Sequence, residues 1–357
     1  MDGNEDLLVE GHMKCKECLM PESRPGSRFV DGVCGACRNF KTRKDVDWES
    51  RSAELNGLLE QFRGATPYDC IVPVSGGKDS HRLVKEIVER GMNPLLVTVN
   101  DSFTHTTAGI DNLRNLIKKF NLNHWQYTIS HDLFVRATRW AFEQTGEALK
   151  FVEYAIYTVP YMLAQQMGIG LVVYGENSAF EYGSTEDNTY VANPVLNNMV
   201  RQIESEYPFW DAGGITADEV NTIKPHIADF PLVIYMSYFI PWSSVDNYEI
   251  AKEYGFRDLT GEWDRLGTIE NFEQIDSYAY MIHLWLKYPK FGFQRVSDIA
   301  SRRVREGRLS LEEAERLIEE KDKEIDPQAL FDFCQTLGYT IDQFWDTVVS
   351  APWKKYG

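Results

Sequence analysis

A glycine-rich turn that joins an apolar strand to a helix constrains the fold of this chain more than any other segment. Residues 70–74 lead directly into the hexapeptide Ser75–Ser80, whose sequence is SGGKDS. Two adjacent glycines let the backbone fold closely around an oxyanion, and free N–H groups at the start of the following helix favour negative charge. Lys78 adds a positive charge, and Asp79 can hold Mg²⁺ on phosphates. The segment predicts a phosphate site; a turn that merely connects two elements is the alternative.

The length of this turn indicates which phosphate chemistry to expect. It is shorter than the G-x-x-x-x-G-K-[ST] loop that holds the β- and γ-phosphates for terminal phosphoryl transfer. It resembles the SGGxDS loop of the ATP pyrophosphatases, or PP-loop enzymes, which release pyrophosphate and adenylate their substrates. The resemblance implies ATP and Mg²⁺ as ligands, and activation of a substrate by AMP in place of kinase chemistry.

Strand-like and helix-like segments alternate after the turn. Apolar runs at 95–99 and 171–174 are typical of buried parallel strands, and residues 124–129 alternate as a further strand. Residues 232–240 are a candidate for a fifth strand. The pattern predicts an α/β fold with a doubly wound, mainly parallel sheet, which the loop resemblance assigns to the PP-loop, adenine nucleotide alpha hydrolase-like type. The hexapeptide and Gly175–Asn177 each follow a strand, so we expect both at the carboxyl edge of the sheet, where such folds bind ligands.

The chain divides by composition and periodicity into five predicted segments. Gly11-His12-Met13 resembles a cloning junction, which makes residues 1–12 a tag or disordered segment. The stretch 178–225 is rich in Gly, Asn and Ser with little periodicity, and is expected to be a long insertion or substrate loop. The predicted segments after residue 12 are a four-cysteine zinc-binding module at 13–40, a linker helix at 41–66, a PP-loop domain at 67–260 that contains the insertion, and a helical C-terminal region at 261–357 that completes the substrate site.

Four of the six cysteines form two C-x2-C pairs, Cys15 with Cys18 and Cys34 with Cys37. Two such turns suit tetrahedral Zn²⁺, and four thiolates close its coordination shell, so the metal should be structural. Iron or an iron–sulfur cluster stays open from the sequence, and two disulfides are the weaker alternative because no signal peptide is evident. Cys70 and Cys334 lie on apolar segments and are expected to be packed core thiols.

The overall charge is strongly acidic, with 37 Lys and Arg against 54 Asp and Glu, giving a formal net charge of −17. Such a surface repels phosphate backbones, so a nucleic-acid partner is not expected. No apolar stretch approaches 18 residues, which predicts no membrane span. The N-terminus lacks a signal-peptide core, and we expect a cytoplasmic protein.

Polar residues at the predicted strand ends are the candidates for chemistry. Lys78 should neutralise charge that develops on a leaving group, while Glu176 and Asn177 could contact the α-phosphate, Mg²⁺ or the activated group. A helix cap is the alternative role of Asn177, and a simple turn is the alternative for Asn100. The predicted catalytic residues are Lys78, Asp79, Glu176 and Asn177. The predicted nucleotide-binding residues are Ser75, Gly76, Gly77, Lys78, Asp79, Ser80, Asn100 and Gly175.

A basic segment with aromatic and glycine residues, 287–303, suggests a local anion site in this acidic chain. The charges alone favour salt bridges on a solvated helix, and the aromatic and glycine context is what shifts the balance toward an anion site. Together with the C-x2-C knuckles, the SGGKDS loop and the motif Gly175-Glu176-Asn177, the run Lys290-Phe291-Gly292-Phe293 resembles the N-acetyl sugar amidotransferases of bacterial surface-polysaccharide and nonulosonic acid pathways. The resemblance implies substrate-site roles for Lys290, Arg295 and Asp298. Gln294 departs from the family pattern, where a glycine is expected.

The resemblance also implies a reaction. The family converts the acetamido group of a nucleotide-linked N-acetyl sugar to an acetamidino group, through an adenylated imidate, and releases AMP and pyrophosphate. No cysteine of this chain lies in a glutaminase-like nucleophile motif. The family implies that a partner glutaminase and a cyclase-like subunit supply the ammonia. The alternatives are a tRNA-modifying, thiolase-like PP-loop enzyme and a zinc scaffold with an inactive nucleotide site.

Overall fold

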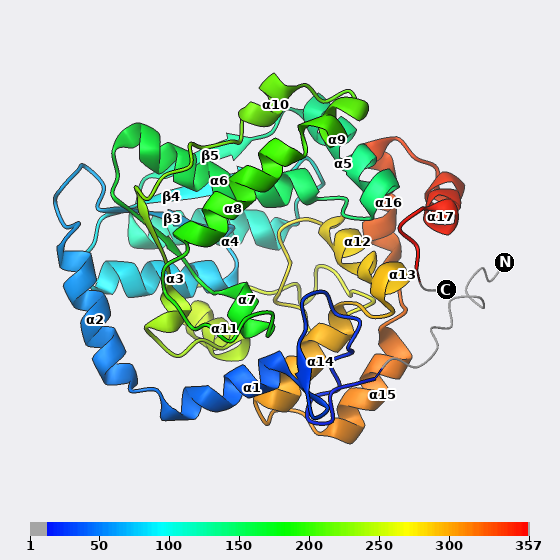
Figure 1. The fold of residues 1–357 in the computed structure, drawn as a ribbon, viewed down its shortest axis with the longest axis horizontal. Coiled ribbons are helices and arrows are strands. Elements are labelled where there is room, and N and C mark those ends of the chain that lie inside the picture. The colour runs from blue at the N-terminus through cyan, green and yellow to red at the C-terminus, as the bar shows by residue number, and fades with distance from the viewer. Residues whose placement is uncertain (1–12, 356–357) are drawn as a thin grey trace.

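A computed structural model describes residues 13–355 of the chain. The predicted tag at 1–12 lies outside the described residues. In Figure 1, helices surround a central sheet, and the N-terminal module lies against helices from the C-terminal part of the chain. Within residues 13–355, none of the helices combines the length and the apolar character that crossing a bilayer requires.

The sheet has five strands in the order β5-β4-β3-β6-β7, all parallel to their neighbours. Their order reverses at β3, because β4 and β5 extend the sheet on one side of it while β6 and β7 extend it on the other. The predicted doubly wound α/β fold is therefore confirmed. The strands are β3 Cys70–Pro73, β4 Pro94–Asn100, β5 His124–Thr128, β6 Leu171–Tyr174 and β7 Leu232–Tyr235.

Alternate residues of the strands pack against different helices, as the pleat of a strand requires. Cys70 and Val72 of β3 join a core cluster with α2 and α3, whereas Ile71 between them joins a cluster with α6 and α8. The helices of these two layers are α2 Trp48–Glu60, α3 Lys78–Glu89, α4 Thr107–Phe120, α6 Lys150–Met167 and α8 Asn193–Ser205, with α5 at His131–Thr145 and α11 at Ser244–Glu253.

Two details differ from the sequence predictions. The expected loop at 178–225 is largely helical, since α8 is accompanied by α7 Ser178–Glu181, α9 Tyr207–Ala212 and α10 Ala217–Asn221. Leu196, Val200 and Ile203 give α8 a buried stripe at helical spacing, which the polar composition obscured. A strand to residue 240 was expected as well, but β7 ends at Tyr235 because the chain turns into the 3-10 helix η2 Met236–Tyr238.

The N-terminal module contains the hairpin of β1 Phe29–Val30 and β2 Val33–Cys34, followed by α1 Gly35–Thr42 and the 3-10 turn η1 Arg43–Asp45. It lies directly on the segment after β6. A Cβ atom on Gly35 would come within 2.2 Å of the carbonyl oxygen of Gly183, so only glycine allows this approach. The predicted linker helix is present as α2.

The C-terminal region is helical from residue 280 onward, as predicted, whereas residues 261–279 form neither a helix nor a continuous strand. Ser310 caps α15 by accepting from the N–H of Glu313, and Thr340 starts α17 with a full capping box. The helices are α12 Tyr280–Trp285, α13 Lys287–Phe291, α14 Arg295–Arg305, α15 Leu311–Lys321, α16 Pro327–Leu337 and α17 Ile341–Ser350.

A buried carboxylate connects the N-terminal module to this region. Asp298 of α14 is 3% exposed and pairs with both Arg24 of the module and Lys287 of α13. Burial by itself would raise the pKa of Asp298, but the charges of Arg24, Lys287 and Arg295 outweigh it and hold the pKa far below its ordinary value. The two cations therefore stabilise the ionised form.

We expect Asp298→Asn to lower the free energy of unfolding at pH 7 by about 3 to 5 kcal/mol, because two cations lose their buried counter-charge. Urea unfolding measures the change, with Asp187→Asn at an exposed position as the control. The pKa is depressed in the folded state, so the stabilisation is present above about pH 4 and should shrink as the pH falls below it. Equal stability of Asp298→Asn and wild type at pH 7 would contradict this role.

Candidate functional site

The hexapeptide loop is held in shape by its own hydrogen bonds. The N–H of Ser75 donates to Oγ of Ser80 at 3.1 Å, and the N–H of Gly77 donates to Oγ of Ser75 at 3.2 Å. Gly76 has a φ of 94°, and a Cβ there would lie 2.7 Å from the backbone nitrogen of Leu113, so this position requires glycine. The loop then runs into α3 at Lys78. The predicted strand–turn–helix arrangement is confirmed.

A cavity of about 390 Å³ lies at the carboxyl edge of the sheet, beside the point where the strand order reverses. This is the place where doubly wound folds bind ligands, and the volume suits a small molecule. Val97, Val99, Ile156, Tyr157 and Tyr280 give the cavity an apolar wall. The predicted residues that line it are Ser75, Gly77, Lys78, Asp79, Ser80, Gly175 and Glu176.

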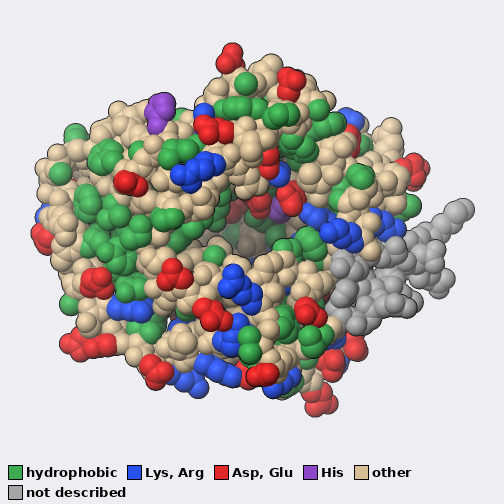
Figure 2. Space-filling view, viewed as in Figure 1, with side chains coloured by type: hydrophobic (Ala, Val, Ile, Leu, Met, Phe, Trp, Pro, Cys, Tyr) green, Lys and Arg blue, Asp and Glu red, His purple; other side chains and the backbone are tan. Residues whose placement is uncertain are grey.

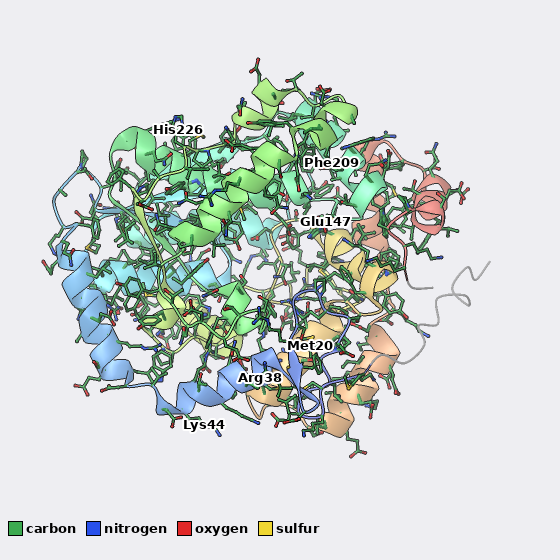
Figure 3. The ribbon with its side chains drawn as sticks, in the orientation of Figure 1. Met20, Arg38, Lys44, Glu147, Phe209 and His226 are labelled. Carbon is green, nitrogen blue, oxygen red and sulfur yellow. The ribbon has the colours of Figure 1, made fainter. Side chains whose placement is uncertain are left out.

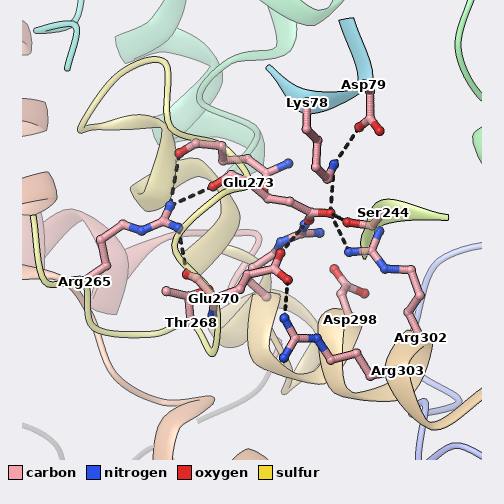
Figure 4. Close-up of polar contacts among 12 residues, drawn as sticks. Lys78, Asp79, Ser244, Arg265, Thr268, Glu270, Glu273, Asp298, Arg302 and Arg303 are labelled. Atoms are coloured by element: carbon pink, nitrogen blue, oxygen red, sulfur yellow. Dashed lines mark hydrogen bonds and ion pairs between the residues drawn. The ribbon is translucent and has the colours of Figure 1, made fainter. Parts of the chain in front are cut away.

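Glu273 binds three cations and a hydroxyl next to this cavity. Its carboxylate is 2.8 Å from Arg302 and 3.0 Å from Lys78 Nζ, and it also contacts Arg295 and Oγ of Ser244. Figure 4 shows Lys78 and Arg302 approaching this carboxylate from opposite sides. A buried carboxylate is stable when it is paired and hydrogen-bonded in this way. Glu273 therefore joins the loop helix to the C-terminal region.

The irregular segment that carries Glu273 is itself fixed by a buried arginine. Arg265 donates from Nη1 to the carbonyl oxygen of Glu273 at 2.8 Å and from Nη2 to that of Glu270, also at 2.8 Å. The side chain of Glu270 pairs with Arg303 at 2.8 Å (Figure 4). Fork-like guanidinium contacts to backbone carbonyls supply the hydrogen bonds that a helix or strand would otherwise provide.

Three further carboxylates surround the large cavity. Asp79 accepts from Asn247 at 2.8 Å and pairs with Lys78 at 2.7 Å. Burial raises the pKa of Asp276 to about 6, and burial together with the charges of Glu181 and Asp79 raises that of Glu176 to about 7. Carboxylate oxygens are the ligands that Mg²⁺ prefers, so Asp79, at the start of the loop helix, could hold Mg²⁺ on bound phosphates.

The remaining predicted residues lie farther from the cavity. Asn100 ends β4 but does not line the cavity, and Asn177 caps α7 by accepting from the N–H of Phe180, which confirms its alternative role. Lys290 pairs with Glu147 at 3.2 Å, and Asp298 lies in the ion pairs described above. Figure 2 shows a hollow at the centre of this face, and Figure 3 places Glu147 above it. Substrate contacts by Lys290 and Asp298 stay predictions.

Gln294, the departure from the family pattern, has an extended backbone with a φ of −141°, which any residue adopts. Its backbone N–H donates to Asp322 at 3.0 Å, and its side-chain amide donates to the carbonyl of Glu324 at 3.0 Å. The start of α14 is therefore ordered without a glycine at this position. The next residue, Arg295, pairs with Glu273.

A second, smaller cavity of about 80 Å³ shares a wall with the first. It lies between α1 of the N-terminal module, α7 and α14. Lys78, Asp79, Glu176, Trp242, Glu273 and Gln274 line both cavities. The charged residues that line only the smaller one are Arg43, Glu181, Arg295, Arg302, Arg305 and Glu306.

The four cysteines of the N-terminal module form a cluster that fits a tetrahedral metal ion. All four are buried, and their sulfur atoms lie within 4.8 Å of one another. The Sγ atoms of Cys15 and Cys37 are 3.8 Å apart and those of Cys18 and Cys34 are 3.6 Å apart, close to the spacing of about 3.8 Å that four Zn–S bonds of 2.3 Å produce. No disulfide joins them. The residues therefore fit the predicted zinc.

Figure 3 places Met20 and Arg38 of the N-terminal module in the lower part of the view. Arg305 of α14 donates to Sγ of Cys18 at 3.5 Å and also lines the smaller cavity. A cation that donates to a metal-bound thiolate orients it, as outer partners of metal ligands commonly do.

Sequence reasoning missed Glu273, Asp276 and Asn247. Glu273 and Asp276 lie in an irregular segment without a motif, and the chain has 54 acidic residues from which nothing in the sequence distinguishes them. Asn247 lies on α11, a helix of mostly polar residues. The one usable signal was the basic run that includes Arg302, since buried cations need a carboxylate partner.

We expect Cys34→Ser to release zinc and to reduce solubility, because a three-thiolate site leaves a module of this size without its stabilising metal. Metal analysis of the purified protein measures the zinc content, and Cys334→Ser, outside the cluster, is the control. Full zinc content in Cys34→Ser would contradict the assignment of the ligands.

We expect Glu273→Gln to lower the free energy of unfolding by about 3 to 5 kcal/mol, because Lys78, Arg295 and Arg302 lose their common counter-charge. Added pyrophosphate should restore more stability to this variant than to wild type, since its charge replaces the lost carboxylate. Thermal unfolding with and without pyrophosphate measures both effects. A variant that is as stable as wild type would show that Glu273 is not the link described above.

Comparisons with known proteins give one family and several remote structures. Residues 266–357 match the family "LPS biosynthesis protein WbpG-like, C-terminal domain". None of the curated proteins matches the chain. Among solved structures, the NMN synthetase of Francisella tularensis is 14% identical with a TM-score of 0.33, over 82% of this chain and 94% of that one. The NH3-dependent NAD synthetase of Campylobacter jejuni is 14% identical with a TM-score of 0.30, over 47% and 78%.

The matched segment contains Glu273, Arg295 and Arg302, so the residues that meet Lys78 come from the domain that the family describes. The family model begins just before the irregular segment and includes every helix from α12 to α17. Residues 266–357 thus match a WbpG-like LPS biosynthesis C-terminal domain, which supports the family suspected from the sequence motifs.

Proposed function

We propose that this protein is an ATP-dependent amidotransferase that converts the acetamido group of a nucleotide-linked N-acetyl sugar to an acetamidino group. One observation carries the proposal: Lys78 of the phosphate-type loop and two arginines of the LPS biosynthesis domain meet at Glu273, beside a ligand-sized cavity. A nucleotide loop and a domain of a surface-sugar pathway thus contribute to a single site.

In the first step, the amide oxygen of the sugar attacks the α-phosphorus of ATP. A bond from that oxygen to phosphorus forms, and the bond from the α-phosphorus to the oxygen of the β-phosphate breaks. The backbone N–H groups of the Ser75–Ser80 loop and Lys78 stabilise the charge that develops on pyrophosphate. Asp79 would hold Mg²⁺, which offsets phosphate charge when bound.

In the second step, ammonia attacks the carbon of the adenylated imidate and the C–O bond to AMP breaks. An amide carbonyl is a poor electrophile, and adenylation turns its oxygen into a good leaving group, so the conversion requires ATP. Cys70 and Cys334 are the cysteines outside the metal cluster; both are buried, and burial raises the pKa of Cys334 to about 11. Neither lines either of the two cavities described above, which favours ammonia from a partner glutaminase and cyclase-like subunit.

The same burial of Cys70 and Cys334 gives no support to a thiolase-like function, because such chemistry uses a reactive cysteine near the nucleotide. Arg295, with Lys290 and Asp298, is proposed for the substrate side of the site, as the family resemblance implies. The cytoplasm is the proposed location, since it supplies ATP and keeps thiols reduced for metal binding.

Mass spectrometry tests the proposed reaction. The protein is incubated with ATP, an ammonium salt and either UDP-linked or CMP-linked N-acetyl sugars. The expected product is lighter than the substrate by the difference between O and NH, and AMP and pyrophosphate accumulate with it. Orthophosphate and ADP as the products would contradict the proposal, because they indicate terminal phosphoryl transfer.

We expect Lys78→Ala to reduce sugar-dependent exchange between ATP and pyrophosphate by about 10²- to 10³-fold, because the leaving group loses its main counter-charge. The circular dichroism spectrum should stay that of wild type. Lys85→Ala removes a lysine from the same helix that pairs with Glu89 away from the cavity, and is the matched control. An active Lys78→Ala enzyme is incompatible with the assigned role.

A further inference from the structure

The smaller cavity has the size of a chamber for one small polar molecule. Its volume of about 80 Å³ exceeds the 10–15 Å³ that one water molecule needs by this kind of measure, but it is about a fifth of the volume of the neighbouring cavity. A nucleotide or a nucleotide-linked sugar does not fit there. Of the reactants in the proposed function, ammonia alone has the matching size.

Glu176 forms part of the wall between the two cavities and lines both. The other carboxylates of the smaller cavity have partners: Glu181 pairs with Arg43, Glu273 with Lys78, Arg295 and Arg302, Asp79 with Lys78 and Asn247, and Glu306 with Arg308. Among the residues that the structure describes, no side chain donates a hydrogen bond to Glu176 or pairs with it. A half-buried carboxylate without a partner is suited to a cationic ligand.

The charged groups around Glu176 lie on several elements: α3, α7 and α14 carry those named below, while Tyr157 of α6 and Glu273 and Asp276 of the irregular segment line the same cavities. Burial and the nearby carboxylates of Glu181 on α7 and Asp79 on α3 raise its pKa to about 7, and Arg302 on α14 and Lys78 on α3 act in the opposite direction. A carboxylate with this pKa is ionised often enough at neutral pH to accept a proton, and it holds that proton better than an ordinary carboxylate does.

We propose that the smaller cavity binds ammonium, and that Glu176 is the catalytic base that deprotonates it for attack on the adenylated substrate in the larger cavity. This inference rests on the proposed function. An N–H bond of ammonium breaks and its proton moves to Glu176; the freed lone pair of ammonia forms a bond to the imidate carbon. The C–O bond to AMP breaks, its electron pair stays on the phosphate oxygen, and the added nitrogen loses one more proton.

The position of Glu176 explains how one group can serve both cavities. It follows β6 directly, at the carboxyl edge of the sheet, two residues beyond the end of the strand. Ammonium bound to Glu176 in the smaller cavity is therefore separated by this one side chain from the larger cavity, which the phosphate-type loop lines. The other walls of the smaller cavity are formed by the aromatic rings of Phe40 and Phe180 and by paired arginines. Among the described carboxylates that line this cavity, Glu176 is therefore the one free to accept from a ligand.

The test separates the two half-reactions. Adenylation is followed by sugar-dependent exchange between ATP and pyrophosphate without ammonium, and amidine formation is followed by mass spectrometry with ammonium. For Glu176→Gln we expect exchange near the wild-type level and amidine formation reduced by about 10²- to 10⁴-fold. Hydroxylamine, which is largely neutral at pH 7, needs no base, so it should restore turnover to the variant and give the hydroxylated amidine.

Three controls make the result decisive. Glu176→Asp keeps a carboxylate and should recover part of the ammonium-dependent rate, and Glu89→Gln removes a carboxylate on the outer side of α3 and should match wild type. In wild type, the ammonium-dependent rate should rise with pH up to about 7 and rise less steeply above it, once Glu176 is ionised. That of Glu176→Gln should show no such bend and should keep following the fraction of unprotonated ammonia, because the variant has no carboxylate to accept the proton. The wild-type profile needs no variant to fold.

The other outcomes overturn the inference or the function separately. Loss of exchange in Glu176→Gln would assign the carboxylate to Mg²⁺ or the phosphates, and normal amidine formation with ammonium would exclude it as the base. Either result refutes the inference while the proposed function stands. A wild-type protein without exchange for any N-acetyl nucleotide sugar would refute the proposed function itself.

Discussion

The carboxylate of Glu273 is the contact on which the site depends. It lies between Lys78 at the start of the loop helix, Arg295 and Arg302 on α14, and Ser244 on α11. Each of these charges is costly to bury alone, and together they compensate one another. The C-terminal region therefore completes the charge balance of the proposed nucleotide site, since neither half can pair its buried charges without the other.

This arrangement also defines how an anionic ligand meets the loop. Three cations stand around one carboxylate beside a cavity whose nearest edge is a set of loop N–H groups. In the proposed function, phosphates bound by the loop would contact Lys78 directly, and the ion pair with Glu273 holds Arg302 close by in a fixed position. Preorganised cations stabilise developing charge better than mobile ones, because no reorganisation is needed during the reaction.

The parts of the site that the sequence predicted are the local ones. The loop could be recognised because its glycines, lysine and strand context are contiguous, and the four-cysteine cluster because its ligands have a regular spacing. Glu273 could not be recognised, because its role depends on the irregular segment 261–279, which Arg265 holds by contacts to backbone carbonyls. Helix α8 could not be predicted for another reason. Asparagines, which are typical of loops, interrupt its buried apolar stripe.

The metal-binding module belongs to the site in the same physical sense. Helix α1 begins directly after Cys34 and contains Cys37, so the sulfur cluster fixes the start of the helix whose residues Ala36, Asn39 and Phe40 line the smaller cavity. Arg305 contacts Cys18 on one side and that cavity on the other. The module is too small to build its own core, so the four thiolates order it. They thereby also fix the part of the wall of the smaller cavity that the module supplies. The predicted structural metal and the proposed site are thus linked through one helix and one arginine.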